Sequence, residues 1–590
     1  MIKKSDISDF FDKECQARKE EMNELYSLPL EERIKKRKAI KNVTIDTEYK
    51  EHKWGCQVRK AYAQVNISDF KVGEYLIIHR NSPFFPDSSC VLFDFMDDGS
   101  ILLGFGNFDK VYYVDQIISD NNNELFILDK SNGDMSNIYT TGFCSIKEDH
   151  IKMINEIPTP QFSDDRDTIE AEIRDTEKNW DLRLTDNQRE AIINAMTAQD
   201  YYLIQGPPGT GKTFVIAFLL LELMRYKKER VAVSGPNHMA INNMLSKLCS
   251  LDNNIAGVTI KIGQEFNTIG LEYKDRNGEL QEVNNGERLN VTKVNNWENE
   301  NVGITVGCTP YHMHTSRARG LKVDTLIIDE AGQMNIGLAL MAMSCAKRVI
   351  FVGDHKQMSP ILSHDNHPTE LNHSIFEHLC KEHNCTTLNT TFRMNAPICN
   401  LISECFYDGV LQSAVPNKRL QQNIQTTDVI FDPEKPIVIK DIVHNGTNTS
   451  EEEADFCVST IIRYINEYHY RTEDIAIIAP FRAQCAMIRR KLKQHKDIVP
   501  DYNSIIVETV DRMQGQESEI VFISLTAGDV DYMSELTNFI FNPHRFNVAM
   551  SRAKNKLIMV GNMTSIESSI NDMECGWLKQ LLQSRYVNRI

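Results

Sequence analysis

The stretch GPPGTGKT at residues 206–213 constrains the fold of this chain more than any other feature. The apolar run YYLIQ (201–205) precedes it and FVIAFLLLELM (214–224) follows, so the loop joins a predicted strand to a predicted helix. Glycine lets the backbone wrap an anion with its N–H groups, and the helix N-terminus adds partial positive charge. The sequence therefore predicts a phosphate loop in which Lys212 contacts nucleotide phosphates and Thr213 binds Mg²⁺. The other loop residues expected at the nucleotide are Gly206, Pro207, Pro208, Gly209, Thr210 and Gly211.

A second predicted strand, TLIIDE (325–330), ends in the adjacent carboxylates Asp329 and Glu330. Adjacent acids at the end of a buried strand are costly unless a metal, a proton or a partner uses them. Given the phosphate loop upstream, we expect Asp329 to hold Mg²⁺ and Glu330 to orient or deprotonate the attacking water. The alternative is a surface acidic pair at a helix N-terminus, which the preceding apolar strand disfavours.

Two series of short apolar strands follow one another from residue 185 onward. The first contains YYLIQ, RVAVSGP, NVGITVGCTP, TLIIDE and RVIFVGD, and the second contains DIAIIAP, SIIVETV, EIVFISL and KLIMVGN. Continuous apolar strands separated by helices predict parallel sheets that are covered on both faces. Because the phosphate loop heads only the first series, the fold class is α/β with two parallel-sheet domains in tandem.

The first part of the chain differs in pattern from the rest. Apolar residues recur at helical spacing over 7–40, and six β-rich runs from 55 to 130, among them KVYYVDQII (110–118), indicate a small β-barrel. Asp98-Gly99 is a favourable hairpin dipeptide between two of these runs. Polar helical sequence returns from about 146 to 180, and the Asn-rich stretch 251–300 is predicted to be an insertion.

Composition excludes several classes of protein. The 590 residues include 14 cysteines but no C-x-x-C pair, which argues against zinc and iron–sulfur modules and favours a reduced, cytoplasmic protein. No run reaches the roughly 18 apolar residues of a membrane span, and the N-terminus lacks the apolar core of a signal peptide. The net charge of −17 argues only weakly against nucleic acid, because a local basic channel can exist on an acidic protein.

Five further motifs follow in a fixed order around these two. They are LTDNQREAI (184–192), GDHKQMSP (353–360), LNTTFRMN (388–395), TVDRMQGQESE (509–519) and RFNVAMSRAK (545–554). This set resembles the superfamily 1 helicases, and most of all the 1B branch, which includes the nonsense-mediated-decay RNA helicase and the immunoglobulin-mu-binding helicase. The resemblance covers nearly the whole chain. It implies two RecA-like motor domains, a helical stalk and a 1B barrel.

The resemblance also implies roles for individual residues. Gln188 would bind the adenine edge, Phe392 would stack on adenine, and Glu517 would bind the ribose hydroxyls. Gln357, Arg393 and Arg552 would contact the γ-phosphate, where a planar guanidinium suits the developing charge. Single-stranded nucleic acid would contact Pro236, Asn237, Thr309, Pro480, Phe481, Arg482, Thr509, Val510 and Asp511.

The implied domains are an N-terminal stalk at 1–50, a barrel at 51–145, a returning stalk at 146–180, a first motor domain at 181–370 that carries the insertion, and a second at 371–590. The implied function is that of an ATP-dependent 5′→3′ translocase or helicase on single-stranded RNA or DNA, acting as a monomer with ATP and Mg²⁺ and targeted by protein partners. The alternatives are an ATP-gated nucleic-acid clamp and a remodelling factor with little strand separation. A protein-remodelling ring ATPase is disfavoured by the second strand series.

Overall fold

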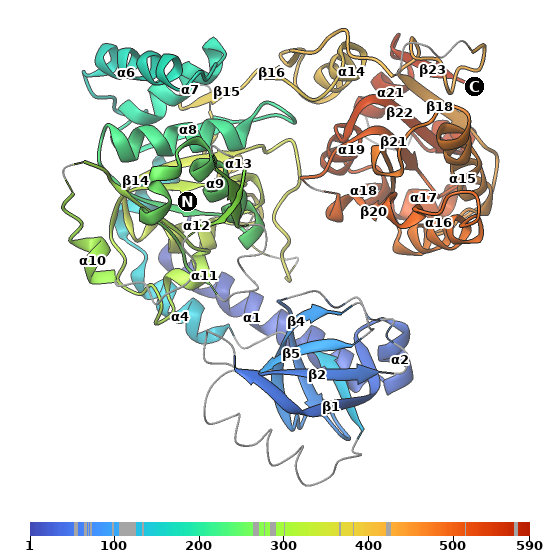
Figure 1. Ribbon diagram of the computed structural model, residues 1–590, viewed down its shortest axis with the longest axis horizontal. Coiled ribbons are helices and arrows are strands. Elements are labelled where there is room, and N and C mark those ends of the chain that lie inside the picture. Colours follow the sequence, from blue (N-terminus) through green and yellow to red (C-terminus); the bar gives the residue numbers. More distant parts are fainter. Residues whose placement is uncertain are drawn as a thin grey trace.

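A computed structural model describes residues 1–51, 57–63, 66, 68, 70, 73–96, 100–105, 125–131, 135–263, 271–275, 278–283, 291–299, 301–364, 367, 369–381, 383–420, 426–513, 515–570 and 576–590. A barrel and two parallel sheets stand apart in Figure 1, with the barrel beyond the end of the long helix α1. Among the described residues, no helix combines the length and apolar character needed to cross a bilayer.

The β-rich segment forms a closed antiparallel barrel, as predicted, in the order β1-β2-β5-β4-β3-β6. Its alternate residues, such as Val43, Leu92 and Leu128, fill the barrel interior. The strands are β1 (Ala39–Glu51), β2 (Gln57–Ala63), β3 (Tyr75–His79), β4 (Ser88–Phe95), β5 (Ile101–Phe105) and β6 (Phe126–Lys130). The expected strand at 110–118 and the Asp98-Gly99 turn lie outside the described residues.

The helices around the barrel differ from the expected boundaries in two places. Helix α1 (Lys4–Ser27) and α2 (Leu30–Lys35) end well before residue 50, because the β-branched run from Ala39 forms the first barrel strand. Helix α4 (Ser136–Ser145) falls within the range expected to be barrel. Its Gly142 packs so closely on Met341 that an added Cβ would lie 2.3 Å from that side chain. The barrel therefore ends earlier than residue 145, at β6.

The first parallel sheet has the order β15-β7-β14-β13-β8-β12-β9. Its strands are β7 (Tyr201–Gln205), β8 (Arg230–Ser234), β9 (Thr259–Lys261), β12 (Ile304–Gly307), β13 (Val323–Ile328), β14 (Ala346–Gly353) and β15 (Cys385–Thr387). The helices from residue 146 onward are α5 (Glu148–Glu156), α6 (Arg166–Asn179), α7 (Asp186–Thr197), α8 (Lys212–Arg225), α9 (His238–Leu251), α10 (Val291–Asn295), α11 (Pro310–Met313), α12 (Ile336–Met343) and α13 (Ile375–Leu379). The described residues of 146–388 are called the first sheet unit below.

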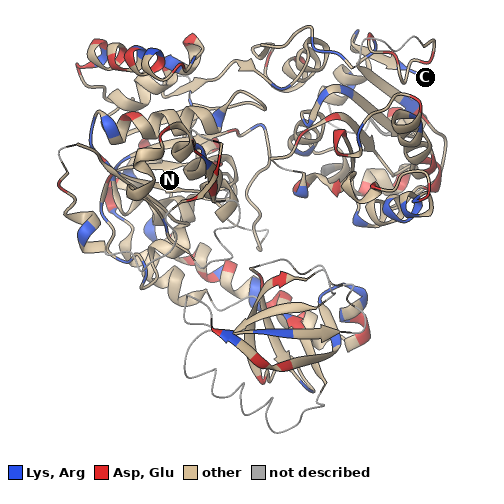
Figure 2. Cartoon of the chain, in the orientation of Figure 1, with Lys and Arg blue, Asp and Glu red and all other residues tan. Residues whose placement is uncertain are grey.

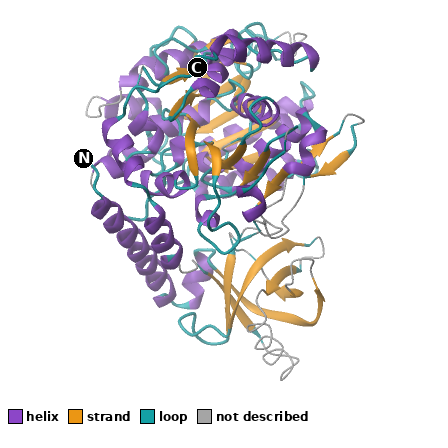
Figure 3. Cartoon of the chain, turned by 90° about the vertical axis from the view of Figure 1, so that its left-hand side faces the viewer, coloured by secondary structure: helices purple, strands orange, loops and turns teal. Residues whose placement is uncertain are grey.

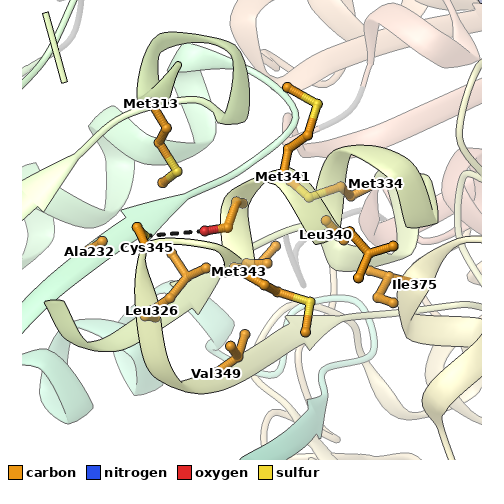
Figure 4. Packing of buried hydrophobic residues seen from close by; sticks show 14 of the residues in the cluster. Ala232, Met313, Leu326, Met334, Leu340, Met341, Met343, Cys345, Val349 and Ile375 are labelled. Atoms are coloured by element: carbon orange, nitrogen blue, oxygen red, sulfur yellow. Dashed lines mark hydrogen bonds between the residues drawn. The ribbon is translucent and has the colours of Figure 1, made fainter. Parts of the chain in front are cut away.

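The two faces of this sheet pack against separate apolar cores. In β13, Leu326 and Ile328 enter one core while Ile327 enters the other, as expected for a buried strand with helices on both sides. Helix α12 is apolar on every side and lies in the first of these cores. Figure 4 shows its Met341 and Met343 among side chains from the sheet and from α13. Flexible thioethers fill such irregular gaps well.

The stretch predicted to be an insertion contributes to the main sheet as well. Strand β9 pairs in parallel with β12 and extends the sheet edge. A separate hairpin, β10 (Glu272–Lys274) with β11 (Leu280–Glu282), follows it. The segment predicted to be an insertion thus includes an edge strand of the main sheet. This strand was not predicted, because a three-residue strand carries too few apolar residues to be recognised.

The second parallel sheet has the order β20-β19-β21-β22-β18-β23. Its strands are β18 (Ile437–Asp441), β19 (Ile475–Ala479), β20 (Ile506–Thr509), β21 (Ser518–Ser524), β22 (Ala553–Gly561) and β23 (Val587–Arg589), and the short pair β16 (Thr390–Thr391) and β17 (Gln412–Ser413) precedes them. Its helices are α14 (Ala396–Phe406), α15 (Glu451–Asn466), α16 (Arg482–Gln494), α17 (Val530–Glu535), α18 (Thr537–Ile540), α19 (Pro543–Met550), α20 (Met563–Ile570) and α21 (Gly576–Leu582). The described residues of 389–590 are called the second sheet unit.

The chain leaves the first sheet unit later than residue 371. Helix α13 packs in a first-unit core, and β15 pairs in parallel with β7 at the sheet edge. Leu388 is buried in the other first-unit core. The expected boundary was therefore about 17 residues early, since 371 to 388 belong to the first unit.

Surface charge does not separate the units. Lys, Arg, Asp and Glu are interspersed along surface helices such as α6, so the excess of acid is spread over the molecule (Figure 2). Helix α1 runs from the first sheet unit to the barrel, and strands dominate the barrel while helices enclose the sheets (Figure 3). At the barrel end of α1, the Tyr26 hydroxyl donates a hydrogen bond to the Lys130 carbonyl of the barrel, 2.9 Å away.

Candidate nucleotide site between two parallel sheets

The glycine-rich loop connects β7 to α8, as the sequence predicts. The Gly206 N–H donates to the Gly353 carbonyl at 2.9 Å, which ties the loop to the end of the neighbouring strand β14. The Thr210 hydroxyl donates to the Pro207 carbonyl at 2.8 Å, and Lys212 Nζ donates to the Gly206 carbonyl at 2.7 Å. The loop therefore curls on itself beneath the lysine, which is the backbone arrangement that presents N–H groups to an anion.

Gly209 is required by its conformation and by a close neighbour. Its φ is +73°, and an added Cβ would lie 2.5 Å from Thr391 Oγ1 and 2.6 Å from Arg393 Cβ. The Phe392 N–H donates to the Gly209 carbonyl at 2.9 Å. The segment that begins the second sheet unit thus rests directly on the phosphate loop.

Replacing Gly209 with alanine tests this contact. Gly320→Ala is the matched control, because Gly320 has φ +84° and nothing within 4 Å of an added Cβ. We expect both variants to lose about 1–2 kcal/mol of unfolding free energy through the left-handed backbone. Gly209→Ala should lose about 1–3 kcal/mol more through overpacking and should raise the KM for ATP. Equal losses in the two variants, measured by denaturant unfolding, would contradict the contact.

The acidic pair lies at the end of β13. The Asp329 N–H donates to the Ser234 carbonyl of β8 at 2.9 Å, and the Asp329 side chain is buried. Burial, and then the negative charge of Glu330, raise the pKa of Asp329 to about 7, while the Lys212 ammonium opposes the shift. Glu330 has φ +51°, and its Oε2 accepts a hydrogen bond from Gln333 Nε2 at 3.0 Å. A non-glycine residue in this conformation costs free energy and is characteristic of functional sites.

A buried carboxylate whose charge is incompletely compensated is suited to a cation. The Thr213 hydroxyl, in the first turn of α8, and the Asp329 carboxylate are the hard oxygen donors that Mg²⁺ prefers. Within the described ranges, no group of three or more His, Cys, Asp and Glu side chains is placed to hold a metal ion.

Gln188 uses part of its amide to hold the loop. Its Oε1 accepts a hydrogen bond from the Thr185 N–H and its Nε2 donates to the Thr210 carbonyl, both at 3.0 Å. These bonds use one of its two amide hydrogens and one of its two carbonyl lone pairs. The predicted contact with adenine stays a prediction. The role of Gln188 in positioning the loop was not predicted from the sequence.

Arg393 and Glu517 form an ion pair. Arg393 Nε donates to Glu517 Oε2 at 2.6 Å, and Arg393 Nη1 donates to the Ser551 carbonyl at 3.0 Å. Lys554 Nζ lies 2.9 Å from the other oxygen of Glu517. Although burial opposes it, the hydrogen bonds and charges of Lys554 and Arg393 lower the pKa of Glu517. Glu517 therefore orients Arg393 here, a contact that the motif comparison did not predict.

Arg552 enters the site from α19 and β22 of the second unit. Only 3% of it is exposed, Nε donates to the Val548 carbonyl at 2.9 Å, and Nη1 donates to the Gln516 carbonyl at 3.1 Å. Burial, followed by the positive charge of Arg393, lowers the pKa of Arg552 to about 9, while Glu330 has the opposite effect. Arg552 therefore remains protonated at neutral pH and interacts electrostatically with Glu330 across the two units.

The remaining predicted nucleotide contacts differ in exposure. The Phe392 side chain is 49% exposed, as a stacking surface requires. Gln357 is buried, and its Nε2 donates to Asp354 Oδ2 at 2.7 Å. Asp354 was not selected from the sequence, although it directly follows β14 in the same motif.

The predicted nucleic-acid residues lie at the carboxyl ends of strands. Pro236 and Asn237 follow β8, and Thr309 follows its neighbour β12; Asn237 and Thr309 both cap helices. In the second unit the corresponding residues follow the adjacent strands β19 and β20, and they are Pro480, Phe481, Arg482, Thr509, Val510 and Asp511. The structure thus brings these residues together in two groups, one on each sheet.

Phe481 and Asp511 have partners within the second unit. The Phe481 ring packs against Phe539, with 5.5 Å between ring centroids, and Asp511 pairs with Arg545 at 3.4 Å. Their direct contact with nucleic acid stays a prediction.

Comparison with known proteins agrees with this geometry. Residues 183–301 and 305–364 match a family model described as an AAA domain, and residues 371–564 match a second model of the same description. The ATP-dependent helicase NAM7 of Saccharomyces cerevisiae is 28% identical over 416 residues, which are 65% of this chain and 42% of that protein. The DNA polymerase alpha-associated DNA helicase A of Schizosaccharomyces pombe is 26% identical over 449 residues, 66% of this chain and 65% of that protein.

A helicase–nuclease is also similar. The DNA replication ATP-dependent helicase/nuclease dna2 of Schizosaccharomyces pombe is 27% identical over 414 residues, which are 65% of this chain and 28% of that protein. The matched region therefore spans less than two thirds of each of these relatives. The chain carries a phosphate loop, an acidic pair and two arginines from the second sheet unit. It belongs to the superfamily 1 helicases, in the branch that includes the nonsense-mediated-decay helicase.

Proposed function

We propose that this chain is a nucleic-acid-dependent ATPase that translocates 5′→3′ along single-stranded RNA or DNA and separates strands. In this proposal ATP is hydrolysed between two RecA-like domains, the first and second sheet units, and α1 serves as a stalk that carries the barrel. The observation that carries the proposal is the hydrogen bond of 2.9 Å from the Phe392 N–H to the Gly209 carbonyl, which places a second-unit segment on the phosphate loop.

The residues of the first unit hold the substrate in this proposal. The loop N–H groups and Lys212 bind the β- and γ-phosphates of ATP. Thr213 and Asp329 would hold Mg²⁺, which supplies charge neutralisation for the phosphates when bound. Glu330 accepts the proton of the attacking water, and Arg552 interacts with it electrostatically across the two units.

The second unit supplies positive charge to the transition state. Arg393, held by Glu517, and Arg552 stabilise the oxygens of the transferred phosphoryl group. Loss of the γ-phosphate removes the group that both arginines share with Lys212, so the two units separate. Alternating grip by the strand ends of the two sheets then moves the polymer, since each sheet carries its own group of contacts at its carboxyl edge.

Steady-state ATPase assays without polymer, with single-stranded DNA and with single-stranded RNA test this function. We expect one polymer to raise kcat by about tenfold or more, the range of an allosteric coupling of 1–3 kcal/mol. All arms need matched salt, because backbone binding weakens steeply with ionic strength. High turnover that neither polymer changes would remove the translocase assignment while leaving the ATP site standing.

Polarity and strand separation need a second assay. Duplexes with a single-stranded tail on either the 5′ or the 3′ side are incubated with the protein and ATP. We expect displacement only where the tail gives a 5′→3′ motor access to the duplex. ATP turnover without displacement on either substrate would instead indicate a clamp.

A further inference from the structure

A buried network of polar side chains joins the two sheet units beside Gln357. Asp354, at the end of β14, accepts hydrogen bonds on both carboxylate oxygens and is 3% exposed. Oδ1 accepts from Gln205 Nε2 at 3.2 Å and from the Lys356 N–H at 3.1 Å. Oδ2 accepts from Gln357 Nε2 at 2.7 Å and from the Tyr407 hydroxyl at 2.6 Å. Tyr407 follows α14, so one of these four donors comes from the second unit.

Asn547 makes a second connection between the units. Its Nδ2 donates to the Tyr407 hydroxyl oxygen at 2.8 Å and to the Lys356 carbonyl of the first unit at 2.7 Å. Both amide hydrogens are therefore engaged, and the order of donors is fixed: Asn547 donates to Tyr407, which donates to Asp354. The network runs without interruption from α19 of the second unit to Gln357 of the first.

The network is maintained at a cost in free energy. Asn547 Oδ1 is buried and has no hydrogen-bond partner among the described residues. A buried acceptor without a partner is unfavourable, and such groups in native structures usually have a functional reason. Here the amide cannot be turned over to satisfy this oxygen without losing the bond to the Lys356 carbonyl of the first unit and the bond to Tyr407.

The protonation state of Tyr407 agrees with this order of hydrogen-bond donors. Burial, and then the negative charge of Asp354, raise the pKa of Tyr407 well above its ordinary value. The phenol therefore stays protonated over the physiological range and serves as the donor to the carboxylate. A hydrogen bond to an ionised acceptor is stronger than one between neutral groups.

Building on the function proposed above, we propose that Tyr407 and Asn547 are positioning residues that set the orientation of Gln357, through Asp354, only when the two sheet units are closed. Gln357 and Tyr407 share Asp354 Oδ2, so removal of the tyrosine hydroxyl changes the acceptor that holds the glutamine amide. When the units separate, Asp354 loses this donor and Lys356 loses Asn547. The γ-phosphate contact of Gln357 is thereby coupled to closure of the cleft.

Tyr407→Phe tests the proposal, with Tyr464→Phe as a matched control. Tyr464 is also a fully buried tyrosine of the second unit, but its hydroxyl donates to the Ile430 carbonyl within that unit. We expect Tyr407→Phe to lower kcat for ATP about tenfold with polymer present, at little change in KM, because one charge-assisted hydrogen bond is lost. Tyr464→Phe should keep the wild-type kcat. Thermal unfolding of both variants checks that the two chains are folded to a similar extent.

A double-variant cycle with Gln357 distinguishes positioning from a merely structural effect. If Tyr407 acts through Gln357, then Tyr407→Phe/Gln357→Ala will be no slower than Gln357→Ala alone, since interacting residues are not additive. Asn547→Ala, which removes the cross-unit donor to the Lys356 carbonyl and the donor to Tyr407, should lower kcat in the same direction as Tyr407→Phe. Full additivity in the cycle, an equal loss of kcat in Tyr464→Phe, or wild-type kcat in both Tyr407→Phe and Asn547→Ala would overturn the inference.

The same measurements separate this inference from the proposed function. Slow turnover by Gln357→Ala together with wild-type turnover by Tyr407→Phe would overturn the inference and leave the ATP site intact. Wild-type turnover by Gln357→Ala would overturn the inference, because Gln357 would then make no contribution to hydrolysis. The proposed function is tested separately, by whether a polymer stimulates ATP turnover of the wild-type chain.

Discussion

Arg552→Ala will slow ATP hydrolysis by about 10³-fold or more while leaving nucleotide binding largely intact. An arginine that stabilises phosphoryl-transfer charge contributes about 10³–10⁵ in kcat. In this chain Arg552 is 3% exposed and held by the carbonyls of Val548 and Gln516, so its guanidinium needs little reorganisation during the reaction. Single-turnover hydrolysis and binding of a fluorescent ATP analogue measure the two quantities separately.

Two controls accompany this variant. Arg463→Ala removes an arginine of the same unit that stacks on Phe431 and pairs with Glu467, away from the site, and should keep wild-type turnover. Arg552→Lys retains a positive charge without the planar donor pair and should recover only part of the rate. Near-normal hydrolysis by Arg552→Ala would remove the role assigned to this arginine.

Lys212→Ala and Glu330→Gln will both abolish ATP turnover, but for different reasons. Lys212→Ala removes the ammonium that lies over the phosphate loop, so nucleotide affinity falls together with kcat. Glu330→Gln keeps the shape of the side chain and removes the proton acceptor, a change worth about 10²–10⁴ in rate. It also removes the negative charge that raises the pKa of Asp329, so nucleotide binding should be retained or strengthened.

The contrast between the two variants is the informative measurement. Equilibrium binding of the ATP analogue should be weak in Lys212→Ala and at least as strong as wild type in Glu330→Gln. Glu467→Gln, a surface substitution on α15, provides the neutralised control. Substantial hydrolysis by either site variant would contradict the assignment of this loop and acidic pair.

Long apolar strands and contiguous motifs were predictable from the sequence. Strand β13 and the carboxylates after it were recognised, because an apolar run that ends in two acids predicts a buried strand with a functional site at its end. The short edge strands β9 and β15 were missed, since three residues are too few to make a recognisable pattern. Helix α4 was placed within the predicted range of the barrel. The close packing of its Gly142 on Met341 joins residues far apart in the sequence, so the sequence did not indicate it.

The candidate site was also predictable only in part. Lys212, Asp329 and Glu330 were selected correctly as neighbours of one loop, because parallel strands end at a common edge of the sheet. The pairing of Arg393 with Glu517 was not predicted. The hydrogen bond between Asp354 and Tyr407 was not predicted either, because it joins residues of different units.

The phosphate loop, the acidic strand end and the strands of the barrel could be predicted from the amino-acid sequence, because each depends on residues close together in the chain. Which side chains meet between the two sheets was known only from the folded chain. Those contacts depend on how the units pack: Phe392 on Gly209, and Tyr407 on Asp354. Local spacing carries no information about such pairs, since each brings together residues more than 50 positions apart, as the separation of 53 between Asp354 and Tyr407 illustrates.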